Sequence, residues 1–197
     1  FAPVLAILAF GPVLIKEKSK KLWTGALFFI LIVFLTALPL GFYFLNNPGD
    51  FFGRSGQVAI WSADSPLKAA ALSVAATLGI FNIAGDFNWR HNYAGSPQLF
   101  WPVGILFLLG IFISLKRREF SDKFLLLWLF IFLLPNVLAT EGNPHALRAL
   151  GAMPAAMIFA GIGLIWIRKK IQKYLDSHQL FRVKKEAFIL LFVFLLF

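Results

Sequence analysis

The side chains of this sequence that could take part in chemistry gather in two short polar stretches. Residues 86–93 read Asp-Phe-Asn-Trp-Arg-His-Asn-Tyr, and residues 140–148 read Thr-Glu-Gly-Asn-Pro-His-Ala-Leu-Arg. Carboxylate, imidazole and guanidinium groups placed together can bind a sugar or a phosphate, because they offer both acceptors and charged donors. The chain has no cysteine, which excludes disulfides, thiolate metal sites and cysteine nucleophiles.

In the first stretch, Asp86, Arg90, His91 and Asn92 are the candidate binding residues. They could position a sugar or a phosphate, or they could equally form a structural ion pair that closes the loop. The interleaved aromatic residues need no further function, since Trp and Tyr prefer the membrane–water boundary. Because His91 and His145 are far apart in the sequence, we predict no metal site.

The second stretch predicts a phosphate site at the start of a helix. If the helix begins near Pro144, a favoured first-turn residue, His145 and Arg148 lie three positions apart and share a face. The helix N-terminus would add a partial positive charge that attracts anions. The alternative is that Arg148 extends to the membrane surface and His145 caps the helix locally; the shortness of the turn favours the phosphate site.

Arg54 is a third candidate, because it follows an apolar run by only a few residues. At that depth its guanidinium could bind two oxygens of a lipid phosphate. A solvated arginine, or one paired with Asp50, is the simpler interpretation, and the sequence alone favours it.

The composition places these stretches in a membrane protein. Of the 197 residues, 59% are hydrophobic and 14% are charged, whereas a soluble domain has about 45–50% and about 25%. The net charge of +10 would suggest nucleic acid in a soluble protein, but in so apolar a chain it indicates the basic cytoplasmic side of a membrane protein. We therefore expect no nucleic-acid partner.

Runs without charge predict the membrane spans. A span needs about 20 mostly apolar residues. Such runs occur at 22–45, 97–115, 124–140 and 149–167, with parts of two further spans at 1–15 and 187–197. Because both ends of the sequence lie inside apolar runs, we expect it to be an internal piece of a longer membrane protein.

Charge also decides the one ambiguous run, residues 69–85, which has no charge but is rich in small residues. If this run lies along the membrane surface, fifteen of the nineteen Lys and Arg residues fall on one side, as the positive-inside rule requires. We therefore predict an all-α, polytopic transmembrane helix bundle with an extracytoplasmic loop, 46–96, that carries an interfacial helix. Gly151, Gly161 and Gly163 predict close helix packing in the last complete span.

The polar motifs resemble those of a known class of membrane enzymes. The matching residues are Pro48 and Arg54, then Gly85-Asp86, Arg90-His91-Asn92 and Gly95-Ser96-Pro97, then His145-Ala146-Leu147-Arg148 and Pro154. Across about 22–167 they resemble the C-terminal part of polytopic glycosyltransferases of the GT-C class, near the dolichyl-phosphate-mannose protein mannosyltransferases and aminoarabinose transferases of family 39.

The resemblance implies an enzyme that moves a hexosyl or pentosyl group from a polyprenyl-phosphate donor to an acceptor lipid, glycan or protein, outside a bacterial or archaeal plasma membrane. It also implies that Arg54, His145 and Arg148 contact the donor phosphate, while residues 86–92 line the sugar or acceptor cavity. The catalytic base of such enzymes is an acid in an N-terminal outer loop, so no residue here is assigned as catalytic. We expect no cofactor and no activity from this piece alone.

Two other functions fit the same residues. One is a non-catalytic transport subunit for lipid or polysaccharide, although the predicted spans contain no ionisable residue of the kind that marks an ion pathway. The other is a ligase or oligosaccharyltransferase that moves whole glycans. An acidic pair in an outer loop upstream of this sequence would favour the glycosyltransferase.

Overall fold

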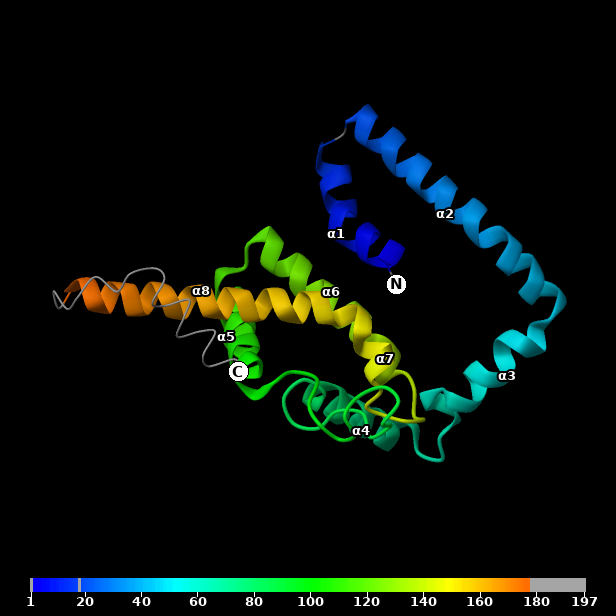
Figure 1. Cartoon of the computed structure of the whole chain (residues 1–197). Coiled ribbons are helices and arrows are strands. Elements are labelled where there is room, and N and C mark those ends of the chain that lie inside the picture. Colours follow the sequence, from blue (N-terminus) through cyan, green and yellow to red (C-terminus); the bar gives the residue numbers. More distant parts are fainter. Residues whose placement is uncertain (1, 18, 178–197) are drawn as a thin grey trace.

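The structure is a computed structural model that describes residues 2–17 and 19–177, and over these residues it is all-α (Figure 1). Its elements are α1 (Ala2–Glu17), α2 (Lys20–Asn46), α3 (Pro48–Val58), η1 (Ile60–Ser62), α4 (Pro66–Gly79), α5 (Trp101–Arg117), α6 (Phe120–Val137), α7 (Ala146–Ala149), η2 (Leu150–Ala152) and α8 (Met153–Ser177). Within the described residues the extended backbone pairs only in an isolated antiparallel bridge between Ala59 and Ala139. The predicted fold class is confirmed.

Three helical segments are long and apolar enough to cross a membrane: α2, α6 and the run Ala146–Tyr174. They correspond to the spans predicted at 22–45, 124–140 and 149–167. The span predicted at 97–115 forms α5, whose 17 residues begin at Trp101, and the partial span at 1–15 forms α1. The span predicted at 187–197 lies outside the described residues.

The predicted outer loop, 46–96, contains more helix than expected. It begins with α3, where Pro48 occupies the first turn and Asp50 follows it in that turn, a helix start that was not predicted from the sequence. The predicted interfacial segment forms α4, which ends at Gly79 and not at 85. Its 14 residues extend about 21 Å, too short to cross a hydrocarbon core of about 30 Å. Its location along the membrane surface stays a prediction.

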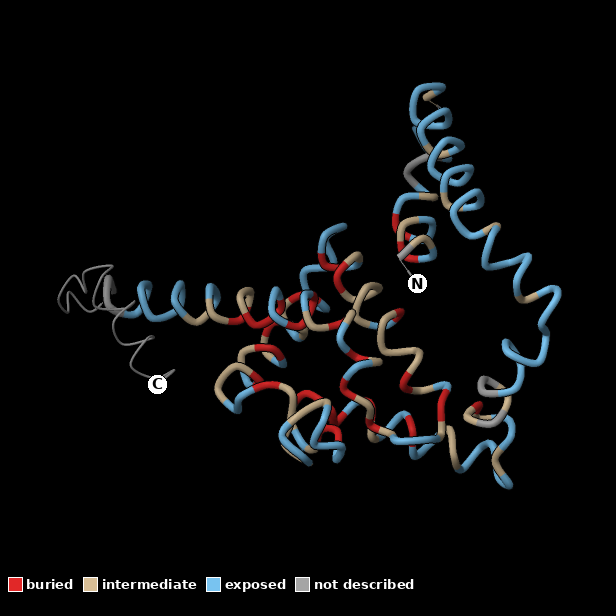
Figure 2. The backbone as a smooth tube through the Cα atoms, turned by 45° about the vertical axis from the view of Figure 1, so that its right-hand side comes forward, coloured by how far each residue is buried: buried red, intermediate tan, exposed pale blue. Residues whose placement is uncertain are grey.

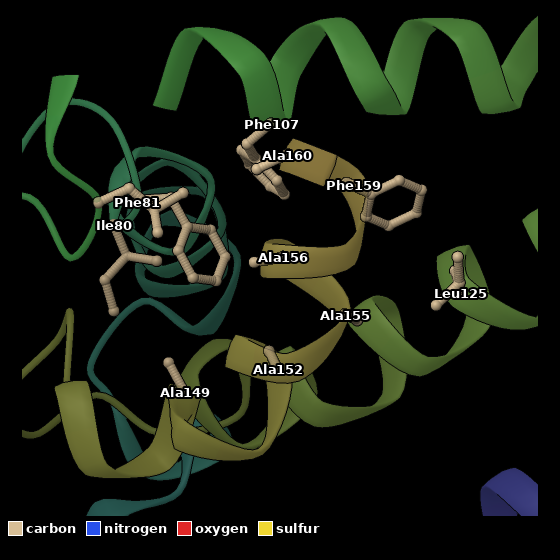
Figure 3. Close-up of a cluster of buried hydrophobic side chains, with 11 residues drawn as sticks. Ile80, Phe81, Phe107, Leu125, Ala149, Ala152, Ala155, Ala156, Phe159 and Ala160 are labelled. Atoms are coloured by element: carbon tan, nitrogen blue, oxygen red, sulfur yellow. The ribbon is translucent and has the colours of Figure 1, made fainter. Parts of the chain in front are cut away.

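The core lies where α5 crosses α8, because small residues allow the two backbones to approach (Figure 3). A Cβ atom added to Gly110 would lie 1.8 Å from the Phe159 carbonyl oxygen, and one added to Gly163 would lie 2.2 Å from the Leu106 carbonyl oxygen. Next to them are the fully buried residues Ala149, Ala152, Ala155, Ala156 and Phe159. The predicted close packing is confirmed at Gly163.

Gly151 and Gly161, the other two glycines predicted to pack closely, do not pack against α5 as Gly163 does. A Cβ atom on Gly151 would lie 2.1 Å from the Phe132 ring, so Gly151 packs against α6 and not against α5. A Cβ atom added to Gly161 would meet no other atom within 4 Å, so the assignment of Gly161 to the packing face was wrong. Along a helix, Gly161 and Gly163 differ by about 200° in direction, which puts them on opposite faces.

The N-terminal helices contrast with this core. α2 has no buried residue, and its helix contacts run to its sequence neighbours α1 and α3. Figure 2 shows α2 mostly exposed, with scattered half-buried positions, and the buried residues concentrated in α4–α8. The described residues therefore leave most of the apolar surface of α2 uncovered.

An ion pair between an exposed arginine and a buried carboxylate closes the turn between α5 and α6. Arg117 donates hydrogen bonds of 2.8 and 2.6 Å to the two oxygens of Asp122, and Asp122 also accepts from the Glu119 amide. Residues 116–123 lie between two predicted spans, yet Asp122 belongs to the first turn of α6 and its side chain is fully buried. Arg118 adopts a left-handed conformation that ends α5, with φ of 57°.

The segment after α6 is held by hydrogen bonds with three earlier elements, α3, η1 and α4. The amide of Ile60 donates to the Leu138 carbonyl, and the amide of Thr140 donates to the Val58 carbonyl. The Ser73 hydroxyl of α4 donates to the Ala139 carbonyl. These bonds fix the start of the turn that carries His145, and they bring it next to the loop between α4 and α5 (Figure 1).

Candidate functional site

The loop between α4 and α5 is closed on itself by backbone hydrogen bonds. The Gly85 amide donates to the Gly95 carbonyl, and the Gly95 amide donates back to the Asp86 carbonyl. Gly95 has a φ of +77°, a conformation that favours glycine. A Cβ atom on Gly85 would lie 2.0 Å from the Ser96 carbonyl oxygen, so only glycine fits there. This closure fixes the backbone that carries Asp86 and His91.

The Asp86 carboxylate is the centre of the site. One of its oxygens, Oδ1, accepts a hydrogen bond of 2.8 Å from the Asn88 amide. The other, Oδ2, lies 2.8 Å from His91 Nδ1 and accepts a bond of 2.9 Å from the Ala146 amide, 60 residues later. Asp86 is only 4% exposed. The carboxylate thus joins the loop to the first residue of α7.

His145 completes the site from the second stretch. Its ring stacks on that of His91, with 4.5 Å between the centroids and 26° between the planes. Its Nδ1 lies 3.8 Å from Asp86 Oδ2. The His145 amide donates to Oδ1 of Asn136, a fully buried residue of α6. Helix α6 and the loop between α4 and α5 therefore determine where this imidazole lies.

The surroundings set the charges of the site. Burial by itself raises the pKa of the Asp86 carboxyl, but the hydrogen bonds from Ala146, Asn88 and His91 outweigh burial and hold that pKa below its usual value. Burial lowers the pKa of His145, and the positive charge of Arg148 lowers it further. At neutral pH the site therefore contains an ionised carboxylate beside a neutral His145 ring.

Several buried polar atoms around the 143–146 turn have no hydrogen-bond partner. Among the described residues, six buried side-chain atoms lack one, and four of them belong to residues of this turn or bonded to it: Gln98 Oε1, Asn136 Nδ2, Asn143 Oδ1 and His145 Nδ1. The other atoms of these groups are engaged, because Gln98 Nε2 donates to the Ala146 carbonyl and Asn143 Nδ2 donates to the Asn136 carbonyl. Such a concentration is typical of a place where a ligand or ordered water binds.

The structure brings together Asp86, His91 and His145 but not the other predicted site residues. Arg90 is exposed, with its guanidinium 5.7 Å from the centre of the Trp89 ring. Asn92 donates to the Ser96 carbonyl, 2.6 Å away, so its amide group is engaged in closing the loop. For Arg54 the structure gives the backbone, within α3, and does not describe the side chain.

The predicted pairing of His145 with Arg148 on one helix face is wrong. α7 begins at Ala146, and His145 precedes it with extended backbone angles, φ −119° and ψ 114°. Arg148 instead turns back along the preceding loop and donates to the Glu141 carbonyl, 2.8 Å away. The reason is that the Ala146 amide is already held by Asp86, which fixes His145 outside the helix.

The prediction of no metal site rested on the distance between His91 and His145 in the sequence. In the structure the two residues nevertheless lie next to each other. The two rings stack on one another, because α5 and α6 form a hairpin that returns the chain to the same place. One ligand atom from each of Asp86, His91 and His145 lies within 4.8 Å of the other two.

Gln98, Asn136 and Asn143 border the site and were not predicted from the sequence. Asn136 had a usable signal, since it follows Pro135 near the end of an otherwise apolar run, where a buried amide needs partners.

No family model matches this chain, and no curated protein or solved structure matches it either.

Proposed function

We propose that this chain belongs to a membrane glycosyltransferase that takes a sugar from a polyprenyl-phosphate donor, with the transfer outside the membrane. The observation that carries the proposal is the convergence of Asp86, His91 and His145, from two stretches that were selected as phosphate- or sugar-binding, at one end of long apolar helices. A lipid-linked substrate needs such an arrangement, because its chain stays in the bilayer while its phosphate lies at the boundary.

The geometry gives each group a task in this proposal. Asp86 holds the His91 ring in one orientation, which is how a carboxylate positions an imidazole for proton transfer or donation. His91 and His145 would donate to the phosphate oxygens. Arg148, which donates to the Glu141 carbonyl in this structure, would have to turn toward the phosphate to stabilise the charge that grows as the phosphate leaves. The base that activates the acceptor would come from another part of the protein.

Substitution of Arg148 tests the assignment. In the full-length protein, Arg148→Ala should lower transfer from a polyprenyl-phosphate sugar by about 100-fold, as expected for loss of one charged donor to a leaving group, while the amount of protein in the membrane stays unchanged. Arg118→Ala, an arginine at the α5–α6 turn, is the matched control and should retain activity. Equal turnover in the two variants would remove Arg148 from the mechanism.

The sidedness has its own test, because the chain has no cysteine of its own. Single cysteines at Ser62 and Lys116 lie in η1 and near the end of α5. In intact cells an impermeant thiol reagent should label Ser62→Cys and leave Lys116→Cys unlabelled. The reverse pattern would invert the topology and place the site on the cytoplasmic side.

A further inference from the structure

The arrangement of Asp86, His91 and His145 has the dimensions of a metal site. A tetrahedral ion with bonds of about 2.0–2.1 Å holds its ligand atoms about 3.3 Å apart. Asp86 Oδ2 lies 2.8 Å from His91 Nδ1 and 3.8 Å from His145 Nδ1. These two distances lie on either side of the required value, so shifts of about half an ångström would give each nitrogen the required distance from Asp86 Oδ2. One ligand atom from each of the three residues already lies within 4.8 Å of the other two.

His145 Nδ1 provides an independent observation. This atom is buried, faces Asp86 and has no hydrogen-bond partner within the described part of the chain. A buried nitrogen without a hydrogen-bond partner destabilises the folded chain, and coordination to a cation would satisfy it. Asp86 Oδ2 can take part without losing the Ala146 amide, because a carboxylate oxygen has two lone pairs.

The surrounding hydrogen bonds are of the kind that orient metal ligands. The Asn88 amide holds the second Asp86 oxygen, and Asn136 holds the backbone of His145. Such outer contacts fix the directions of the ligand lone pairs before an ion arrives. The ring stack keeps the imidazoles of His91 and His145 next to each other.

We propose that Asp86, His91 and His145 bind one divalent transition-metal ion, with Zn²⁺ as the best fit, and that the fourth position of the ion is open to a phosphate oxygen. Two imidazoles and one carboxylate suit Zn²⁺ and disfavour Mg²⁺ and Ca²⁺, which prefer oxygen ligands. Three protein ligands and one open position are typical of a zinc site that acts on a substrate. The binding of the ion is independent of the proposed function; only its role, to polarise the donor phosphate, rests on that function.

Metal binding can be measured directly on the purified full chain in detergent, after removal of metal with a chelator. Isothermal titration with Zn²⁺ should show one site per chain, and titration with Mg²⁺ at the same concentrations should show none. His91→Ala and His145→Ala should each weaken Zn²⁺ binding at least tenfold. His178→Ala is the matched control, since the chain has three histidines and no cysteine, and it should bind Zn²⁺ as the unsubstituted chain does.

A second measurement guards against variants that fail to fold. Zn²⁺ should raise the thermal midpoint of the unsubstituted chain and of His178→Ala, and leave the midpoint of His145→Ala unchanged. Replacing Zn²⁺ with Co²⁺ should give the intense visible absorption of a tetrahedral site, which Asp86→Asn should lose. Binding only at millimolar Zn²⁺, or equal binding by His145→Ala and His178→Ala, would overturn the proposal.

Two measurements separate this inference from the proposed function. Tight Zn²⁺ binding by the purified chain, without binding of polyprenyl phosphate, would leave the metal site standing and remove the glycosyltransferase. Transfer by the full-length protein that continues unchanged after chelation, while the chain binds no Zn²⁺, would remove the metal site and leave the glycosyltransferase.

Discussion

α2 and α8 are both apolar helices long enough to span a membrane, yet only one of them is packed. α8 has Phe159 and two alanines, Ala155 and Ala156, fully buried against its neighbours, whereas α2 has no buried residue. The difference lies in the small residues. A Cβ added to Gly163 of α8 or Gly110 of α5 would meet another backbone, but one added to Gly25 or Gly41 of α2 would meet nothing within 4 Å. Hydropathy therefore indicates which helices are apolar enough for a membrane, whereas small residues determine which helices can pack closely against each other.

The comparison can be tested most strongly at two phenylalanines. Phe159→Ala should lower the free energy of unfolding by about 3–5 kcal/mol, because it opens a cavity in the α5–α8 core. Phe34→Ala, on the exposed surface of α2, should change it by less than about 0.5 kcal/mol. Unfolding in mixed micelles, followed by circular dichroism, measures both. A large loss for Phe34→Ala would show that this chain packs against α2 after all.

A pair of glycines gives the next largest contrast. Gly110→Ala should cost about 2–3 kcal/mol, because the new methyl group must push α5 away from the Phe159 carbonyl. Gly41 has open space around it, and alanine has a higher helix propensity than glycine. The thermal midpoint of Gly41→Ala should therefore stay equal or rise slightly. Thermal melting of the two proteins in the same detergent decides the matter, and identical midpoints would refute the close approach of α5 and α8.

At the end of the packed region, two neighbouring arginines extend the comparison. Arg117→Ala should cost about 2 kcal/mol, since it leaves the buried Asp122 without its cation; that is less than for a fully buried pair because the Arg117 side chain is 42% exposed. Arg118→Ala should cost less than about 0.5 kcal/mol, because the exposed Arg118 side chain donates to the nearby Leu115 carbonyl and the bond of its amide to Ser114 does not depend on the side chain. Chemical denaturation of both variants provides the measurement, and a reversed order would show that the ion pair does not stabilise the turn.

The smallest effect concerns the turn that carries His145. Asn136→Ala should cost about 1–2 kcal/mol, because it leaves the buried His145 amide without an acceptor. Hydrogen exchange at the His145 amide should then become faster, while exchange within α2 stays the same. Unchanged protection of that amide would show that Asn136 does not hold the turn.

The sequence could predict the helices but not their partners. Charge-free runs located α2, α6 and α8 because length and hydropathy are local properties. The start of α7 was misplaced because Pro144 is a good first residue of a helix by propensity, while the contact that decides the start, from Asp86, lies far away in the sequence. The close contact between Gly110 and the Phe159 carbonyl was not predicted, because nothing in the sequence indicates which residue packs against Gly110.

The same limit applies to the candidate site. Asp86, His91 and His145 could be selected from their types and their position near apolar runs, but their mutual contact depends on how α5 and α6 fold back. Arg148 and Asn92 were selected on the same grounds, and each bonds a backbone carbonyl instead. Residue type therefore identified the candidates, and only the tertiary fold separated those that converge from those that do not.

The bond between Asp86 and the Ala146 amide also sets an order of events during synthesis. When Asp86 leaves the ribosome, its partner residues at 145 and 146 have not yet been made, and α5 and α6 must both be made before them. Until then the carboxylate lacks the Ala146 amide and the loop lacks its link to the later helices. The site therefore exists only in chains in which α5 and α6 have been made and have folded back on the loop, which makes it a marker of that folding step.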